Sequence, residues 1–79
     1  MATKKLSEMS IGESGVIKIV GGDGLIRRRL FDMGVTPGAE LFLRKKAPLG
    51  DPYEVTLRGY ELTLRKAEAE NVTVEVKDA

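Results

Sequence analysis

The sequence contains neither cysteine nor histidine, and this absence removes several kinds of chemistry. Disulfides, cysteine nucleophiles, Ser-His-Asp triads and transition-metal sites with thiolate or imidazole ligands all need one of these residues. A chain without cysteine suits a reducing compartment, and no apolar run is long enough for a signal peptide or a membrane-spanning helix. We therefore expect a cytoplasmic protein that does not insert into a membrane.

Aromatic residues are also scarce, at 5% of the chain. Two tyrosines and two phenylalanines, dispersed along the sequence, are too few for the stacking platform of a single-strand nucleic-acid binder. Carboxylates are numerous but scattered, so the pattern indicates neither a calcium site nor an acid–base pair. We expect a protein that is not an enzyme, needs no cofactor, has no dedicated metal site and binds no nucleic acid.

The length of 79 residues predicts one small domain over residues 1–79. The formal net charge is +1, but the charge is unevenly distributed. Residues 1–47 hold nine basic and five acidic side chains, whereas residues 48–79 hold four and seven. The basic clusters at residues 27–29 and 44–46 would form one basic patch if the fold brought them together.

Short segments of alternating apolar and polar residues predict most of the secondary structure. Residues 1–13 are expected to begin as a fraying polar tail, with Leu6, Met9 and Ile11 as apolar anchors. The expected strands are residues 14–20, 39–47, 53–57, 61–65 and 72–76, with one helical turn at most in 66–71. Five short strands and one helix favour a mainly β fold, a small SH3-like or OB-like partial barrel.

The single expected helix covers residues 25–33, because Ile26, Leu30 and Met33 recur at i, i+4 and i+7. Asp23 is placed to cap the start of this helix, and Gly34 to end it. The glycine-rich segment before it, residues 21–24, matches no nucleotide-binding fingerprint and is interpreted as a tight turn.

Two further local features concern side chains near this helix. Arg27 and Arg28 point away from the apolar stripe, and Arg28 is spaced to pair with Asp32. After the helix, Pro37 and Gly38 predict a type II turn with a positive φ at Gly38.

Leu49 lies between Pro48 and Gly50, where it is poorly placed for a strand core. Its side chain either folds back as a plug or is exposed for a partner. The sequence leaves both alternatives open.

Three segments together resemble one family. Residues 29–38 (RLFDMGVTPG), 47–52 (APLGDP) and 62–69 (LTLRKAEA) occur in an order and spacing similar to those of FeoA ferrous iron transport proteins. The resemblance runs from about residue 6 to residue 76 and implies a small cytosolic SH3-like barrel. It also implies a partner, the membrane ferrous iron transporter FeoB, whose cytosolic part carries a GTPase domain.

The resemblance implies action through protein contact, with modulation of the transporter's activity or assembly. We expect Leu25, Arg27, Arg28 and Leu49 to form the partner-binding surface. Two alternatives stay open at this point. One is a regulatory SH3-like module akin to the C-terminal domain of iron-dependent repressors, and the other is a weak carboxylate metal binder. The sequence does not predict the oligomeric state.

Overall fold

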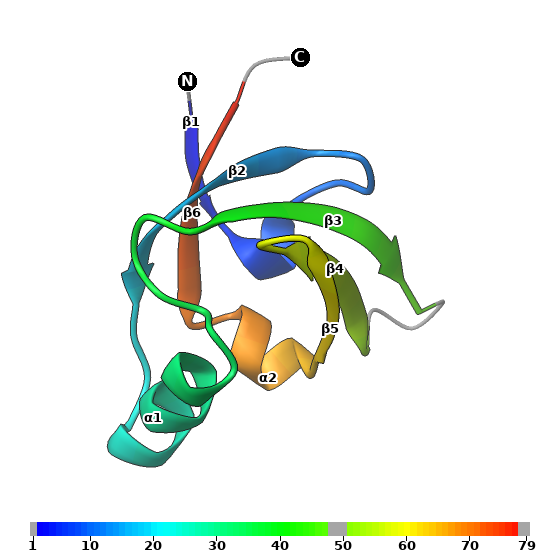
Figure 1. Ribbon diagram of the computed structural model, residues 1–79. Helices are drawn as coiled ribbons and strands as arrows, with labels where there is room; N and C mark the ends of the chain where they lie inside the picture. Colours follow the sequence, from blue (N-terminus) through cyan, green and yellow to red (C-terminus); the bar gives the residue numbers. More distant parts are fainter. Residues whose placement is uncertain (1, 48–50, 78–79) are drawn as a thin grey trace.

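One strongly curved antiparallel sheet organises the chain, with a helix set against one end of it (Figure 1). The computed structural model describes residues 2–47 and 51–77. The elements in chain order are β1 (Ala2–Lys5), the 3-10 helix η1 (Leu6–Glu8), β2 (Ser14–Val20), α1 (Gly24–Asp32), β3 (Glu40–Lys46), β4 (Tyr53–Leu57), β5 (Tyr60–Leu64), α2 (Lys66–Ala69) and β6 (Val72–Val76). The sheet order is β1-β6-β2-β3-β4-β5.

The described residues form six strands, so the expected count of five is wrong by one. The missing strand is β1, in the segment expected to fray. It pairs antiparallel with β6, from Ala2 opposite Val76 to Lys5 opposite Thr73. The polar sequence of β1 carries little strand signal, but β6 has a second edge whose N–H and C=O groups pair with those of β1. Lys4 further anchors the strand through an ion pair with Glu13, 3.1 Å long.

The one helical turn expected within residues 66–71 is present as the short helix α2, and the described residues also hold the 3-10 helix η1. Both short helices contact each other between the two edge strands, where the sheet does not close. The Tyr53 hydroxyl donates to the carbonyl of Ser7 in η1 at 3.0 Å, which fastens β4 across this opening. The result is a partial barrel, as the strand pattern predicts.

The inner face of the sheet and one side of α1 enclose the core. Leu6 and Met9 are fully buried as expected, whereas Ile11 is exposed, so it is not the anchor that the sequence suggested. The largest fully buried side chains are Leu6, Met9, Ile17, Leu30, Val35, Leu43, Val55, Leu57, Leu64, Val72 and Val74.

A register shift in β2 changes which residues face this core. Ile17 pairs with Val74 and Ile19 with Thr73, so Lys18 is the extra residue of a β-bulge. Ile17 and Val20 are therefore buried, while Ile19 is 60% exposed. Strict alternation would have placed Ile17 and Ile19 on the same side.

The β4–β5 hairpin has a two-residue turn at Arg58 and Gly59, so β5 begins at Tyr60, one residue before the expected strand at 61–65. Both turn residues have positive φ, 51° and 86°, which is the geometry of a type I′ turn. Leu57 and Tyr60 close the hairpin. This fixes the register of β5, the last strand on its side of the sheet.

Candidate docking surface

The helix α1 is held at both ends by the local signals that the sequence contains. The Ile26 N–H donates to the Asp23 carboxylate at 3.0 Å, which confirms the N-terminal cap. At the other end, Gly34 has φ 91°. Its N–H donates to the carbonyl of Phe31, and the Val35 N–H donates to the carbonyl of Leu30. These two bonds form a Schellman motif, so the C-terminal stop is also confirmed.

Packing of α1 leaves Leu25 at the surface. Leu30 is fully buried, and Ile26 and Met33 pack against the core, as their spacing predicts. Leu25 is 84% exposed, the highest value among the large apolar side chains of the described chain. The first turn of α1 therefore presents an apolar side chain to solvent.

The three arginines of α1 do not converge on one point. Arg27 lies over the Phe31 ring, 4.7 Å from its centroid, and its Nε donates to the carbonyl of Val20 at 3.2 Å. Arg29 pairs with Glu68 of α2 at 3.1 Å. Arg27 and Arg29 thus fasten α1 to its neighbours in the fold.

Arg28 is exposed, and within residues 2–47 and 51–77 it has no ion pair. The predicted pair with Asp32 is therefore wrong. An exposed ion pair between residues i and i+4 stabilises a helix by only about 0.5 kcal/mol or less. This energy is too small to hold two long side chains in one arrangement. Arg28 remains available at the surface near Leu25.

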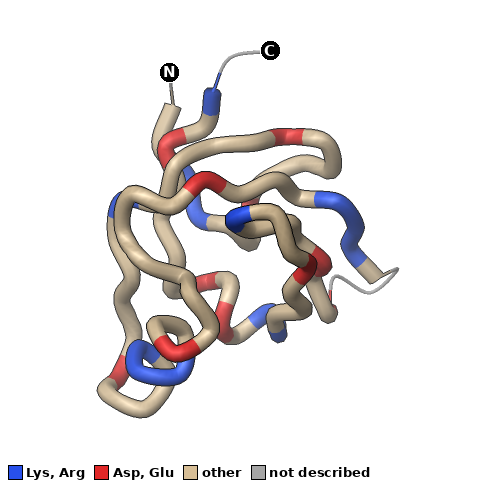
Figure 2. The backbone as a smooth tube through the Cα atoms, viewed as in Figure 1, with Lys and Arg blue, Asp and Glu red and all other residues tan. Residues whose placement is uncertain are grey.

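The two basic clusters do not meet. Figure 2 shows the blue segment of α1 and the blue segment at the end of β3 at opposite ends of the molecule. In the second cluster, Arg44 pairs with Glu61 and Lys46 lies 5.5 Å from the Tyr53 ring centroid. The fold therefore contains no joined basic patch of residues 27–29 and 44–46.

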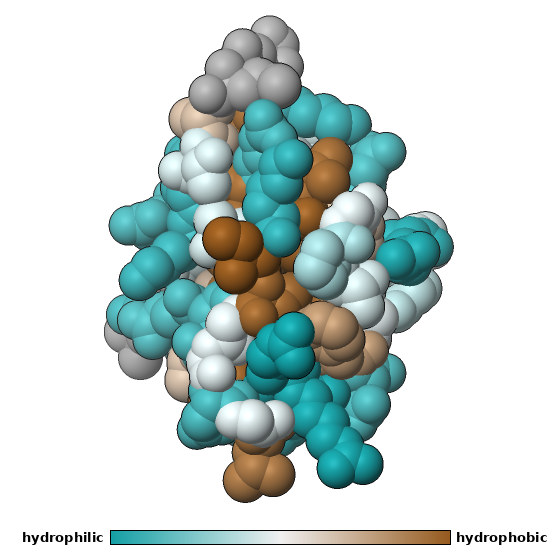
Figure 3. Space-filling model, turned by 90° about the vertical axis from the view of Figure 1, so that its left-hand side faces the viewer, coloured by the Kyte–Doolittle hydropathy of each residue, from teal (hydrophilic) through white to brown (hydrophobic). Residues whose placement is uncertain are grey.

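Exposed apolar residues occur on both sides of the sheet and on α1. The large ones in the described chain are Ile11, Ile19, Leu25, Phe42 and Tyr60. Figure 3 shows the side of the molecule at the left of Figure 1, where an apolar area is framed by hydrophilic residues. The exposure of Ile19 was not predicted, because the β-bulge at Lys18 cannot be recognised from the amino-acid types of residues 16–20.

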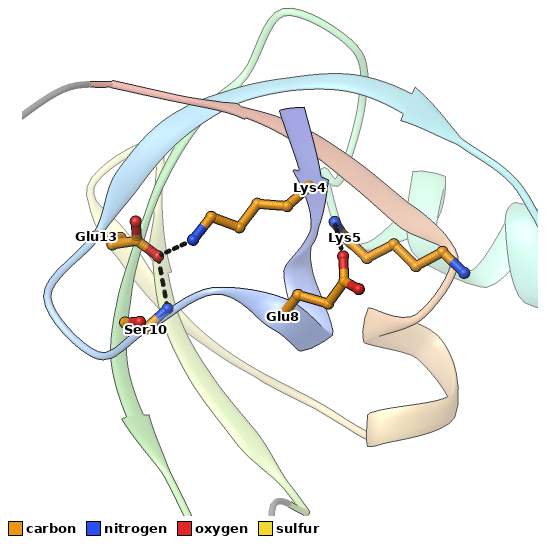
Figure 4. Close-up of polar contacts among 5 residues, drawn as sticks. All are labelled: Lys4, Lys5, Glu8, Ser10 and Glu13. Atoms are coloured by element: carbon orange, nitrogen blue, oxygen red, sulfur yellow. Dashed lines mark hydrogen bonds and ion pairs between the residues drawn. The ribbon is translucent and has the colours of Figure 1, made fainter. Parts of the chain in front are cut away.

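A hollow of about 290 Å³ lies between β1, the end of β6 and the loop before β2. The charged side chains that line this hollow form ion pairs with one another or with neighbouring residues. Glu13 accepts from the Ser10 N–H at 2.6 Å and from Lys4 at 3.1 Å (Figure 4). The hydrogen bond from Ser10 and the contact with Lys4 lower the pKa of Glu13 below its ordinary value. This paired arrangement serves the fold and carries no reactive group.

Neither a metal centre nor a membrane-spanning helix is found in the part of the chain that the structure describes. No three or more Asp or Glu side chains there are grouped to hold a metal ion. No helix there has the length and apolar character needed to cross a bilayer. Leu49, the remaining expected contact residue, lies outside the described residues.

Comparison with known proteins supports the resemblance. The FeoA domain model matches residues 4–76. A Porphyromonas gingivalis protein, the Fe(2+) transport protein A/Fe(2+) transporter FeoB fusion protein, is 35% identical over 72 residues, which are 91% of this chain and 8% of that protein. The chain thus spans less than a tenth of this curated relative.

Solved structures give the same result for the fold. The solution structure of FeoA from Chlorobium tepidum is 43% identical, with a TM-score of 0.86, over 95% of this chain and 71% of that one. FeoA of Stenotrophomonas maltophilia, crystallised with zinc and described as an SH3 domain protein, is 30% identical over 91% of this chain and 89% of that one, with a TM-score of 0.76.

A manganese-dependent transcriptional repressor shares the fold alone. It is 15% identical, with a TM-score of 0.87, and this chain covers 42% of it. The predicted mainly β, SH3-like fold is confirmed. Because the FeoA model matches nearly the whole sequence, the chain belongs to the FeoA family.

Proposed function

We propose that this protein is a non-enzymatic accessory of ferrous iron uptake, which docks on the cytosolic region of the transporter FeoB and modulates its activity or assembly. The observation that carries the proposal is the Porphyromonas gingivalis relative, in which transport protein A and FeoB form one polypeptide. Fusion keeps two modules at high effective concentration, which favours even a weak contact between them. Separate chains of the same families would make this contact by docking.

The first turn of α1 supplies the contact surface in this proposal. Leu25 offers an exposed apolar side chain, and Arg28 an exposed guanidinium three residues away. Residues three apart on a helix are neighbours, so these two groups lie on one surface. Arginine is one of the residue types enriched among those that dominate protein interfaces. We keep Arg27, which is exposed beside them, as a further proposed contact. Leu49 also remains a proposed contact residue, but it lies outside the described residues and is not placed on this surface.

The proposal is tested by binding of the protein to an immobilised FeoB cytosolic region, with GDP or a GTP analogue present. We expect binding in at least one nucleotide state, and a loss of about tenfold or more for Leu25→Ser and Arg28→Glu. Ile11→Ser and Lys45→Glu are the matched controls, because both side chains are exposed and lie outside α1. Absence of binding to both the isolated region and the intact transporter would refute the proposed function.

A further inference from the structure

The sheet has two edge strands, and the edge of β1 is partly occupied by the chain itself. The Lys5 N–H donates to the Glu8 carboxylate at 3.0 Å, at the point where β1 turns into η1 (Figure 4). Since alternate residues of a strand point their N–H groups to opposite sides, Thr3 is the other outward residue of the described β1. With the Lys5 N–H already bonded, this edge offers fewer free groups than the edge of β5.

The edge of β5 is open. Leu57 and Tyr60 close a two-residue hairpin, so Tyr60, Leu62 and Leu64 bond to β4. The N–H and C=O groups of Glu61 and Thr63 therefore point away from the sheet. Both residues are exposed, and no described residue hydrogen-bonds to these four groups. Four backbone groups in register are a template for an added strand.

Apolar side chains border this open edge on the inner side of the sheet. Leu62 is half-buried against the core, and Tyr60 is 43% exposed. The Tyr60 hydroxyl donates to the Met33 carbonyl at 2.7 Å, so the start of β5 is fixed beside the C-terminal end of α1. Alternate side chains of an added strand would cover Leu62 and Tyr60.

Charged residues at the ends of β5 favour one kind of added strand over another. Arg58 and Arg65 flank the strand and are exposed, whereas the Glu61 carboxylate is paired with Arg44. Antiparallel pairing of two copies, centred on Leu62, would place Arg58 of one copy opposite Lys66 and next to Arg65 of the other, at both ends. Like charges this close are unfavourable, so the edge suits a strand with acidic ends better than a second copy.

We propose that the open edge of β5 binds an extended segment of the FeoB cytosolic region, which adds to the sheet as a further strand. The segment alternates apolar residues over Leu62 and Tyr60 and carries acidic residues near Arg58 and Arg65. This inference rests on the proposed function and names the backbone contact by which the partner is held. It is independent of the α1 surface, because it depends on main-chain groups of Glu61 and Thr63.

Thr63→Pro tests the inference, with Thr63→Ala as the matched control. Proline removes the outward N–H and puts its ring where the incoming carbonyl would lie, while the fold does not use this N–H. We expect Thr63→Ala to bind the immobilised FeoB cytosolic region like the wild type, and Thr63→Pro at least about tenfold more weakly. The folding of both variants is checked by their amide NMR spectra.

The outcomes separate the two proposals. Equal binding by Thr63→Pro and wild type overturns the edge-strand inference and leaves the proposed function standing. No binding by the wild type refutes the proposed function, and this inference with it. If Thr63→Pro does not fold, amide hydrogen exchange in the wild type decides. Exchange at Glu61 and Thr63 should slow at least about tenfold when the FeoB region is added, and unchanged exchange overturns the inference.

Discussion

Replacing Gly34 with alanine tests the junction between the end of α1 and the start of β5. Gly34 has φ 91°, a conformation that disfavours any side chain with a Cβ. A Cβ at this position would also collide with the Tyr60 hydroxyl. That hydroxyl donates to the Met33 carbonyl at the last turn of α1, so one substitution disturbs both the helix stop and the link to β5.

The expected loss of stability has two parts. The positive φ costs about 1–2 kcal/mol for alanine. Displacing the tyrosine hydroxyl removes a hydrogen bond with a net contribution of about 0.5–1.5 kcal/mol. Gly34→Ala should therefore lower the free energy of unfolding by about 1.5–3.5 kcal/mol. For a domain of this size, each kcal/mol shifts the melting temperature by about 4–8 °C.

A double-mutant cycle with Tyr60→Phe separates the two parts in urea unfolding followed by circular dichroism. Phenylalanine has no hydroxyl to displace, so Gly34→Ala should cost only about 1–2 kcal/mol in that background. Gly38→Ala is the control, because Gly38 has φ 93° and no atom lies within 4 Å of its added Cβ. The control should be additive with Tyr60→Phe. Additivity of Gly34→Ala and Tyr60→Phe within about 0.5 kcal/mol would refute the reasoning.

Three further predictions concern the stability of the fold, measured by thermal or urea unfolding. Gly38→Val should lower the melting temperature, because a β-branched residue resists the positive φ of the type II turn, and an unchanged value would contradict that turn. Gly15→Ala should lower the free energy of unfolding by more than about 2 kcal/mol, since its Cβ would collide with the backbone carbonyl of Glu75. A smaller loss would contradict this close approach of β2 and β6. The lowered pKa of Glu13, caused first by the Ser10 N–H, gives stability that is present above pH 4.5 and lost as the pH falls. Glu13→Gln should therefore be less stable at neutral pH and approach the wild type in acid, and parallel pH profiles would argue against it.

Interactions between residues close in sequence were predicted well. The Asp23 cap, the Gly34 stop and the turn at Gly38 each depend on the conformational preferences of one or two residues. The turn is confirmed by the Ala39 N–H, which donates to the Thr36 carbonyl at 3.1 Å. The alternation that predicts the strand at residues 39–47 is also confirmed, because Leu41 and Leu43 are buried and Phe42 between them is exposed.

Contacts between distant segments could not be predicted in the same way. The strand β1 has a polar sequence and forms because β6 offers an unpaired edge more than 65 residues later in the chain. Arg29 bonds to Glu68 in another helix, although the spacing of Arg28 and Asp32 suggested a local pair. The bulge at Lys18 turns Ile19 outward and depends on the register between β2 and β6.

The sequence alone determined the start and end of α1, the alternation of the central strands and the membership of a family, because each rests on the order of neighbouring residues. Only the tertiary structure decided which edge of the sheet is open, which arginines are engaged and how far apart the basic clusters lie. The physical reason is that hydrogen bonds and ion pairs form wherever the folded chain brings partners together. Exposure of Leu25 and the open edge at Glu61 and Thr63 are properties of that arrangement.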